Sequence, residues 1–160
     1  MVLVEQPKES SPLSRSASNS KMSIGTEPTL IQIKNMQFLI MDAPRQGNLN
    51  LYIKKMRKHH VTEVVRFCEQ TYKGDDLTNA GIGLHEMEYK DGTSPSKELI
   101  DNWLNLVNST FSSNSGGEPP CIAVHCVAGL GRAPQMVAIA LIEFANMDPV
   151  DAVASSRSEQ

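Results

Sequence analysis

Short apolar runs alternate along the chain with longer stretches in which apolar residues recur at every third or fourth position. Five runs have the length of buried strands. They are residues 29–33, 37–41, 61–68, 82–85 and 121–124. Two stretches, residues 49–56 and 99–110, have the spacing of a helix with one apolar face. Residues 136–142 are continuously apolar and rich in Ala, Leu and Met, which predicts a helix with little solvent-facing surface. This alternation predicts an α/β domain with a mostly parallel central sheet flanked by helices.

Residues with known preferences for helix ends set the expected boundaries. Asn48 is the expected N-cap of the first helix, and Ser94 followed by Pro95 is the expected start of the second. Residues 71–81 predict a loop, because their apolar content shows no period. A last helix is expected from Asp148.

The length predicts one domain between two polar ends. A chain of 160 residues with 40% hydrophobic residues is enough for a single core. Residues 1–28 are rich in Ser and Pro, which predicts a disordered tail. Residues 29–153 carry the domain pattern, and residues 154–160 form an expected polar tail.

Charge and composition exclude some classes of protein. The net charge of -3 argues against a nucleic-acid binder. No apolar run approaches the roughly 20 residues of a membrane-spanning helix, and no secretory signal pattern is present. Three cysteines without framework spacing favour a reducing compartment, so we expect a cytoplasmic protein, with the nucleus as an alternative.

The loop between the strand at residues 121–124 and the helix at residues 136–142 carries the candidate chemistry. A strand, a tight loop with two glycines and a helix together point several backbone N–H groups at one position, near the positive helix end. Cys126 stands at the start of this loop, where a thiol ionises more readily than a free one. Arg132 follows six residues later, and its guanidinium fits two oxygens of an oxyanion. These groups predict a nucleophile for phosphate esters.

The string His-Cys-Val-Ala-Gly-Leu-Gly-Arg-Ala-Pro at residues 125–134 resembles the signature loop of the phosphatases of regenerating liver. This family, abbreviated PRL, is the type IVA branch of the cysteine-dependent dual-specificity phosphatases. Further segments resemble the same family in the same order: residues 34–40, 64–72, 91–92, 103–104 and 137–143. The resemblance covers about residues 29–153. It implies a dual-specificity phosphatase fold, here without the family's final helices.

The resemblance implies hydrolysis of phosphotyrosine, phosphoserine or phosphothreonine in proteins through a phosphocysteine intermediate, without metal or other cofactor. Cys126 is the expected nucleophile, Asp91 the general acid and Arg132 the group that stabilises the transition state. His125 is expected to orient the loop, and Cys68 is the implied redox partner of Cys126. The implied phosphate-binding loop consists of Val127, Ala128, Gly129, Leu130, Gly131 and Arg132.

The chain departs from the family before the expected acid. The family commonly has Trp-Pro-Phe there, whereas this chain has Met87, Glu88 and Tyr89, followed by Lys90 in place of an acid. Asp91 precedes a glycine, so an ordinary turn residue is the alternative interpretation. Glu86 and Glu88 are alternative acids.

Ala133 stands where many cysteine phosphatases have a Ser or Thr whose hydroxyl helps the sulfur to leave. We therefore expect slow breakdown of the phosphoenzyme. The alternative function is a low-activity binding module that engages cyclin M family magnesium-transport regulators through the active-site cleft, as the resemblance implies.

The family continues beyond the matched region with further helix, a polybasic segment and a prenylation box. The last four residues of this chain are not a Cys-a-a-X box, so no lipid anchor is expected. A third hypothesis is that the shortened chain does not fold, because the net stability of a domain is only about 5–15 kcal/mol.

Overall fold

The computed structural model describes residues 23–112, 116–127 and 131–157, and these contain one five-stranded sheet. The strands are β1 (Thr29–Ile33), β2 (Met36–Asp42), β3 (Val61–Arg66), β4 (Gly83–Glu86) and β5 (Cys121–Cys126). Their order across the sheet is β1-β2-β5-β3-β4. The β1–β2 pair is antiparallel and the other three pairs are parallel. The prediction of a mostly parallel sheet is confirmed.

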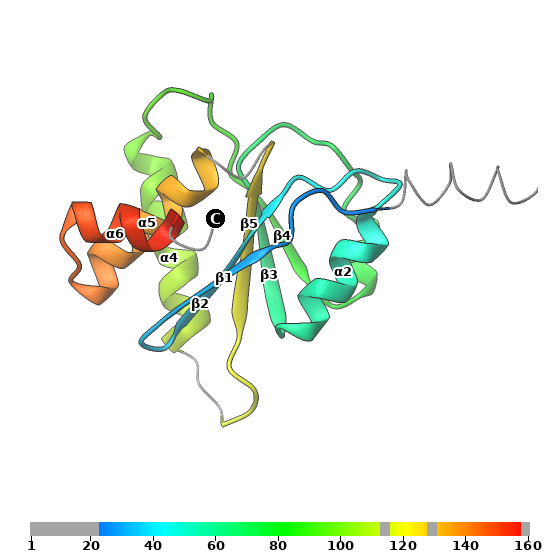
Figure 1. Cartoon of the computed structure of the whole chain (residues 1–160), viewed down its shortest axis with the longest axis horizontal. Helices are drawn as coiled ribbons and strands as arrows, with labels where there is room; N and C mark the ends of the chain where they lie inside the picture. The colour runs from blue at the N-terminus through cyan, green and yellow to red at the C-terminus, as the bar shows by residue number, and fades with distance from the viewer. Residues whose placement is uncertain (1–22, 113–115, 128–130, 158–160) are drawn as a thin grey trace, which may run out of the picture.

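Helices cover both faces of this sheet (Figure 1). In the described residues they are α2 (Leu49–Lys58), α3 (Asp75–Asn79), α4 (Lys97–Ser112), α5 (Arg132–Ala145) and α6 (Pro149–Arg157). Helix α2 lies on one face, and α4, α5 and α6 lie together on the other. The predicted α/β class is therefore confirmed.

Strand β5 lies in the middle of the sheet, and all six of its residues are buried. Successive side chains of a strand point to opposite faces. Ile122, Val124 and Cys126 belong to the core beneath α4 and α5. Cys121 and Ala123 belong to the core beneath α2, so Cys121 is a packing residue, as expected. A strand covered on both faces needs an apolar run without alternation, which is what the sequence has here.

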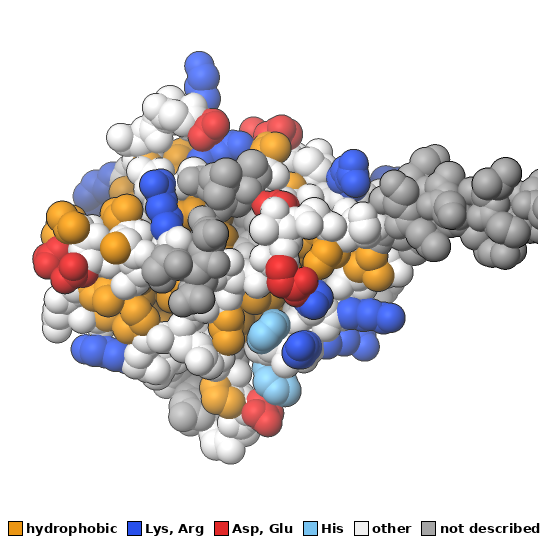
Figure 2. Space-filling view, in the orientation of Figure 1, with side chains coloured by type: hydrophobic (Ala, Val, Ile, Leu, Met, Phe, Trp, Pro, Cys, Tyr) orange, Lys and Arg blue, Asp and Glu red, His pale blue; other side chains and the backbone are white. Residues whose placement is uncertain are grey.

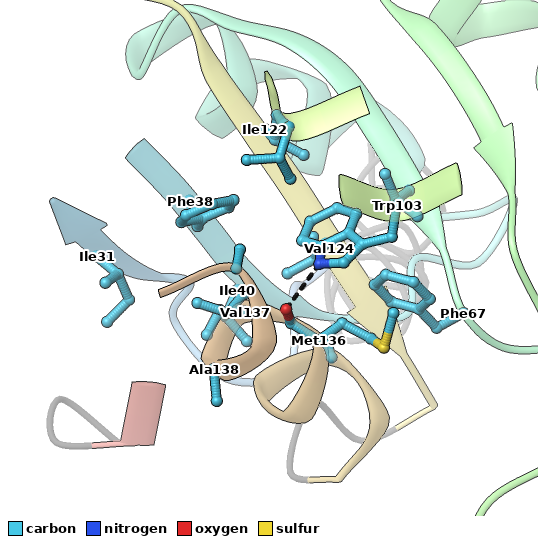
Figure 3. Close-up of a cluster of buried hydrophobic side chains, with 14 of the residues drawn as sticks. Ile31, Phe38, Ile40, Phe67, Trp103, Ile122, Val124, Met136, Val137 and Ala138 are labelled. Atoms are coloured by element: carbon cyan, nitrogen blue, oxygen red, sulfur yellow. Dashed lines mark hydrogen bonds between the residues drawn. The ribbon is translucent and has the colours of Figure 1, made fainter. Parts of the chain in front are cut away.

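Trp103 of α4 is completely buried in the larger core (Figure 3). Its ring lies edge-on to Phe67, with 5.5 Å between ring centroids, and is tilted against Phe38. Its Nε1 donates a hydrogen bond of 2.7 Å to the carbonyl oxygen of Met136. This bond connects α4 directly to α5, the helix that follows the predicted phosphate-binding loop.

Two helices differ from the sequence prediction. Residues 71–81 are not all loop, because α3 forms within them and buries Leu77. Helix α4 begins after Ser96, whose Oγ accepts the hydrogen bond from the Leu99 N–H, rather than at Ser94. Asn48 is the N-cap residue of α2, as predicted, but its side chain does not cap the helix, since its Oδ1 accepts a hydrogen bond from the Arg45 N–H instead.

Both predicted tails are shorter than expected. The end of the first one is attached to the domain, because the Thr26 N–H donates to Asp42 Oδ2 and Asn48 Nδ2 donates to the Ser23 carbonyl. Residues 1–22 of that tail lie outside the described part of the chain. Helix α6 continues through residues 154–157 of the expected polar tail, because Ala152 and Ser156 are buried. Residues 158–160 lie outside the described part.

The surface has one basic and one apolar area in this view (Figure 2). Basic side chains gather over α2, whose last turn contains Lys55, Arg57 and Lys58, and cations suit the C-terminal end of a helix dipole. Hydrophobic side chains are exposed over α5 and α6, including Ile142 and Val150. Among the described residues, none of the helices has the length and hydrophobicity to span a membrane.

We predict that Trp103→Phe lowers the free energy of unfolding by roughly 1–3 kcal/mol, because it removes both the bond to Met136 and part of the buried ring. Urea unfolding followed by circular dichroism measures this change, since the variant has no tryptophan left to report fluorescence. An unchanged unfolding midpoint would contradict the prediction.

Candidate active site

The candidate site lies where β5 ends and α5 begins, at the carboxyl edge of the parallel strands, where open α/β sheets bind ligands. Val127 and Gly131 are the described ends of the predicted phosphate-binding loop, and both are exposed. Ala128, Gly129 and Leu130 lie outside the described residues. The site is therefore built here from the residues on either side of them.

Cys126 is the last residue of β5, and it is buried, with 3% of its surface exposed. The backbone N–H of Ala133 donates a hydrogen bond of 3.4 Å to its Sγ. Ala133 belongs to the first turn of α5, so its N–H is one of the groups that lack a partner inside the helix. This donor and the positive end of the helix dipole both stabilise negative charge on the sulfur.

The Arg132 guanidinium is buried and is held by two backbone carbonyls. Its Nη1 donates to the Tyr89 carbonyl at 2.9 Å and to the Phe67 carbonyl at 3.3 Å. Its Nε has no hydrogen-bond partner in the described part of the chain. Because buried N–H groups almost always have partners, an unpaired guanidinium N–H in the first turn of α5 is available to an anion.

Asp91 reaches the same place from the loop after β4. Its Oδ1 lies 4.0 Å from Arg132 Nε, while 77% of its side chain is exposed. Gly92 follows with a φ of 80°, a conformation that favours glycine, so the turn after Asp91 is real. Gly131 lets the two loops approach, because a Cβ at that position would lie 3.4 Å from Asp91 Oδ1. The fold thus brings Asp91 to Arg132 across 41 positions of sequence.

The two alternative acids, Glu86 and Glu88, differ in their contacts and position. Both carboxylate oxygens of Glu86 accept hydrogen bonds from the buried Arg66 guanidinium. This hydrogen bonding lowers the pKa of Glu86, so its carboxylate stays ionised and has no proton to give near neutral pH. Glu88 is exposed on the acid loop, residues 87–94. The geometry therefore argues against Glu86.

His125, the residue before Cys126, contacts Tyr72 and Cys68 in the interior of the domain. Its ring is completely buried, with Nε2 2.8 Å from the Tyr72 hydroxyl oxygen and Nδ1 3.8 Å from Cys68 Sγ. Burial, followed by the positive charge of Arg66, lowers the pKa of His125 to about 3. The imidazole is therefore neutral at pH 7, and its two ring nitrogens face Tyr72 and Cys68.

Tyr72, which contacts His125, and Arg66, which contacts Tyr72, are two buried residues that the sequence analysis missed. Arg66 Nη1 donates to the Tyr72 carbonyl at 2.9 Å, and the guanidinium carbon lies 4.4 Å from the centroid of the Tyr72 ring. The available signal was an arginine inside the apolar run of β3, since a buried charge needs a partner. Arg66 and Tyr72 thereby hold His125, the residue before the predicted nucleophile.

Cys68 lies just beyond the end of β3 and belongs to the same buried cluster as Cys126. Burial raises the pKa of the Cys68 thiol to about 11, with the negative charge of Glu69 as the next cause. The thiol is thus protonated at neutral pH. All three cysteines, Cys68, Cys121 and Cys126, are free thiols.

Tyr89 is another residue that the sequence analysis did not assign. It is buried, its carbonyl accepts the bond from Arg132, and its hydroxyl donates to Gln135 Oε1 at 2.7 Å.

A cleft of about 500 Å³ lies beside these residues, lined by Asp91, Gly131, Arg132 and Gln135 and continuing along α5 and α6. In the described residues, no cluster of three or more His, Cys, Asp or Glu side chains is placed to hold a metal ion.

Sequence comparisons connect this geometry to known proteins. A family model described as "Polymorphic toxin system, DSP-PTPase phosphatase" matches residues 40–146. The protein tyrosine phosphatase PRL-1 of Trypanosoma cruzi is 40% identical over 144 residues, which cover 86% of this chain and 80% of the relative. The mouse protein tyrosine phosphatase type IVA 2 is 41% identical over 133 residues, covering 83% of this chain and 77% of the relative.

Solved structures agree with these relatives. A putative protein tyrosine phosphatase from Leishmania major superposes with a TM-score of 0.77 at 37% identity, over 84% of this chain and 90% of that one. The kinase associated phosphatase superposes with a TM-score of 0.61 at 14% identity, over 83% and 84%, and this likeness shows the fold alone. The matches reach well beyond the loop at residues 125–134, and the chain belongs to the PRL, or type IVA, family of protein tyrosine phosphatases.

Proposed function

We propose that this protein hydrolyses phosphate monoesters of tyrosine, serine or threonine in proteins through a phosphocysteine on Cys126. Two observations carry the proposal: the Cys126 sulfur accepts the N–H of Ala133 in the first turn of α5, and the buried Nε of the preceding residue, Arg132, has no partner in the described part of the chain. A phosphoryl group bound between them would give the buried N–H its missing partner. The identity to PRL phosphatases supports the same chemistry.

In the first step the Cys126 thiolate attacks phosphorus, an S–P bond forms and the P–O bond to the substrate breaks. Backbone N–H groups of residues 127–132 and the Arg132 guanidinium hold the three equatorial oxygens as their charge changes. Asp91 gives its proton to the leaving oxygen. Its position 4.0 Å from Arg132 supports this role, because the leaving oxygen must lie on the side of the phosphoryl group away from the sulfur.

In the second step a water attacks phosphorus, Asp91 takes up its proton, and the S–P bond breaks to release phosphate and the thiolate. The sulfur leaves with the Ala133 N–H as its hydrogen-bond donor, at 3.4 Å. Ala133 has no hydroxyl to add a second donor. We therefore propose that breakdown of the phosphoenzyme is slow and limits turnover.

Cys68 would protect the nucleophile from irreversible oxidation. A peroxide oxidises the Cys126 thiolate to a sulfenic acid and is itself reduced to water; the Cys68 thiol then forms a disulfide with it and releases a second water. The burial of Cys68 in the cluster that contains Cys126 supports this pairing. The raised pKa of Cys68 keeps its thiol protonated at neutral pH, which suits the role of resolving thiol rather than that of first nucleophile. Free cysteines also support a reducing compartment, the cytoplasm or the nucleus.

A second candidate function is binding without much turnover. Two observations favour this function. Position 133 has no hydroxyl, and the Asp91 carboxylate is exposed, with its Oδ1 4.0 Å from Arg132 Nε. In this case the cleft would engage cyclin M family magnesium-transport regulators, and phosphocysteine would block the complex.

We predict that Cys126→Ser lowers the rate of phosphate release from a phosphotyrosyl peptide by at least about 10³-fold, because the nucleophile is lost. Acid-quenched samples with radiolabelled substrate should contain phosphoprotein for the wild type and none for the variant. Cys121→Ser is the matched control, since Cys121 lies in the other core. Turnover of Cys126→Ser at the wild-type rate would exclude this mechanism.

Ala133→Ser should accelerate breakdown of the phosphoenzyme by roughly ten- to hundredfold, the effect of one hydrogen bond to a charged group. Rapid-quench kinetics separates this step from phosphocysteine formation, which should change little. The slow-turnover proposal fails if the phosphoenzyme of the variant decays no faster than that of the wild type.

If the protein is a binding module, Asp91→Ala should bind a purified cyclin M protein as tightly as the wild type, and orthovanadate should compete with the partner. Isothermal titration calorimetry measures both. A phosphate-free wild-type protein that shows no heat of binding would contradict this function and leave the enzyme proposal intact.

A further inference from the structure

The acid loop, residues 87–94, starts with two backbone hydrogen bonds to the end of β3, from the Met87 N–H to the Arg66 carbonyl at 2.9 Å and from the Tyr89 N–H to the Phe67 carbonyl at 3.4 Å. Its hydrogen bonds with α5 are made by Tyr89. Tyr89 is the one buried residue of this loop, with 9% of its surface exposed. Its ring lies edge-on to Phe67, 6.2 Å between centroids. The following residues Lys90 and Asp91 are exposed. The placement of Asp91 therefore depends on what holds Tyr89.

Tyr89 is bonded to the first turn of α5 through both its backbone and its side chain. The carbonyl accepts the 2.9 Å hydrogen bond from Arg132 Nη1. The hydroxyl donates to Gln135 Oε1 at 2.7 Å, and the carbonyl oxygen of Arg132 lies at 3.2 Å as a second acceptor. Burial, with the charge of Cys126 as the next cause, raises the pKa of this hydroxyl to about 12. The group therefore remains a hydrogen-bond donor at neutral pH.

These contacts are what a loop anchor needs. The ring of Tyr89 could remain in its apolar position with many loop conformations, because packing against Phe67 has little direction. The hydrogen bond from the Tyr89 hydroxyl to Gln135 is directional, and it joins the acid loop to the helix that carries Arg132. Asp91 is only two residues away, so a shift of Tyr89 moves the carboxylate away from Arg132 Nε.

We propose that the Tyr89 hydroxyl is a positioning group that holds the acid loop against α5, with Gln135 as its acceptor, and so keeps Asp91 above the phosphoryl site. The inference rests on the proposed role of Asp91 as general acid. Tyr89 itself touches no reacting atom. Its effect must therefore appear in proton donation to the leaving group rather than in the attack by Cys126.

The test compares two aryl phosphates in Tyr89→Phe, which removes only the hydroxyl. Phenyl phosphate has a leaving group that needs a proton, whereas the leaving group of dinitrophenyl phosphate departs without one. We expect kcat/KM for phenyl phosphate to fall by about three- to tenfold, the factor typical of one lost hydrogen bond, and kcat/KM for dinitrophenyl phosphate to stay unchanged. The parameter kcat/KM is used because it reports phosphocysteine formation and not the slow second step.

Three further variants make the result specific. Tyr52→Phe removes another buried tyrosine hydroxyl, in the core beneath α2, and should leave the ratio of the two kcat/KM values at the wild-type value. Gln135→Leu should lower the ratio by no more than Tyr89→Phe does, because the hydroxyl keeps the Arg132 carbonyl as an acceptor, and the double variant should lower it no further than Tyr89→Phe alone. Asp91→Asn should lower the ratio most.

Several results would overturn the proposal. An equal loss on both substrates in Tyr89→Phe would mean a general structural role, and a wild-type ratio would mean no role for the hydroxyl. A wild-type ratio in Asp91→Asn would instead remove the acid assignment, and the positioning role with it.

Hydrogen exchange tests the anchor without turnover. With the proposal correct, amides of residues 87–94 exchange faster in Tyr89→Phe than in the wild type or Tyr52→Phe. Unchanged exchange of this segment would overturn the anchor even if the protein proved inactive on both esters.

Discussion

The buried guanidinium of Arg132 is the group on which the site depends, because it joins three segments that are distant in sequence. Its Nη1 is bonded to the carbonyls of Phe67, after β3, and Tyr89, after β4, while its backbone begins α5. Those bonds orient the guanidinium, and its Nε has no partner in the part of the chain that the structure describes. A buried cation without such bonds would be too costly to keep, and with all its donors satisfied it could not bind phosphate.

The parallel sheet supplies the carbonyls that this arrangement needs. Strands β3, β4 and β5 run in the same direction, so their carboxyl ends meet at one edge. Phe67, Tyr89 and Cys126 all lie at or just beyond that edge. Behind them, Tyr72 and neutral His125 form a second buried layer that Arg66 connects to Glu86. In the described residues, the proposed anion site is thus bordered by strand ends and a helix start.

The two catalytic steps that we propose depend on different parts of this site. Formation of phosphocysteine needs Asp91, which reaches the site on a loop attached through Tyr89. Breakdown needs a donor to the sulfur, and among the described residues the Ala133 N–H is that donor. An exposed acid and a leaving sulfur without a hydroxyl donor at position 133 suit the long-lived phosphoenzyme that we propose. This is also the property that would let phosphorylation of Cys126 control a binding partner.

The sequence by itself determined the strand and helix alternation, the buried run of β5 and the positions of Cys126 and Arg132, because these follow from local periodicity and from spacing within one loop. It also led to Asp91, through resemblance. It did not lead to Tyr89, Tyr72 or Arg66, it missed α3, and it placed the start of α4 too early. Tyr89 meets Gln135 across 46 positions and Tyr72 meets His125 across 53. Such partners are chosen by the order of strands in the sheet, which no local pattern encodes, and only the tertiary structure decided them.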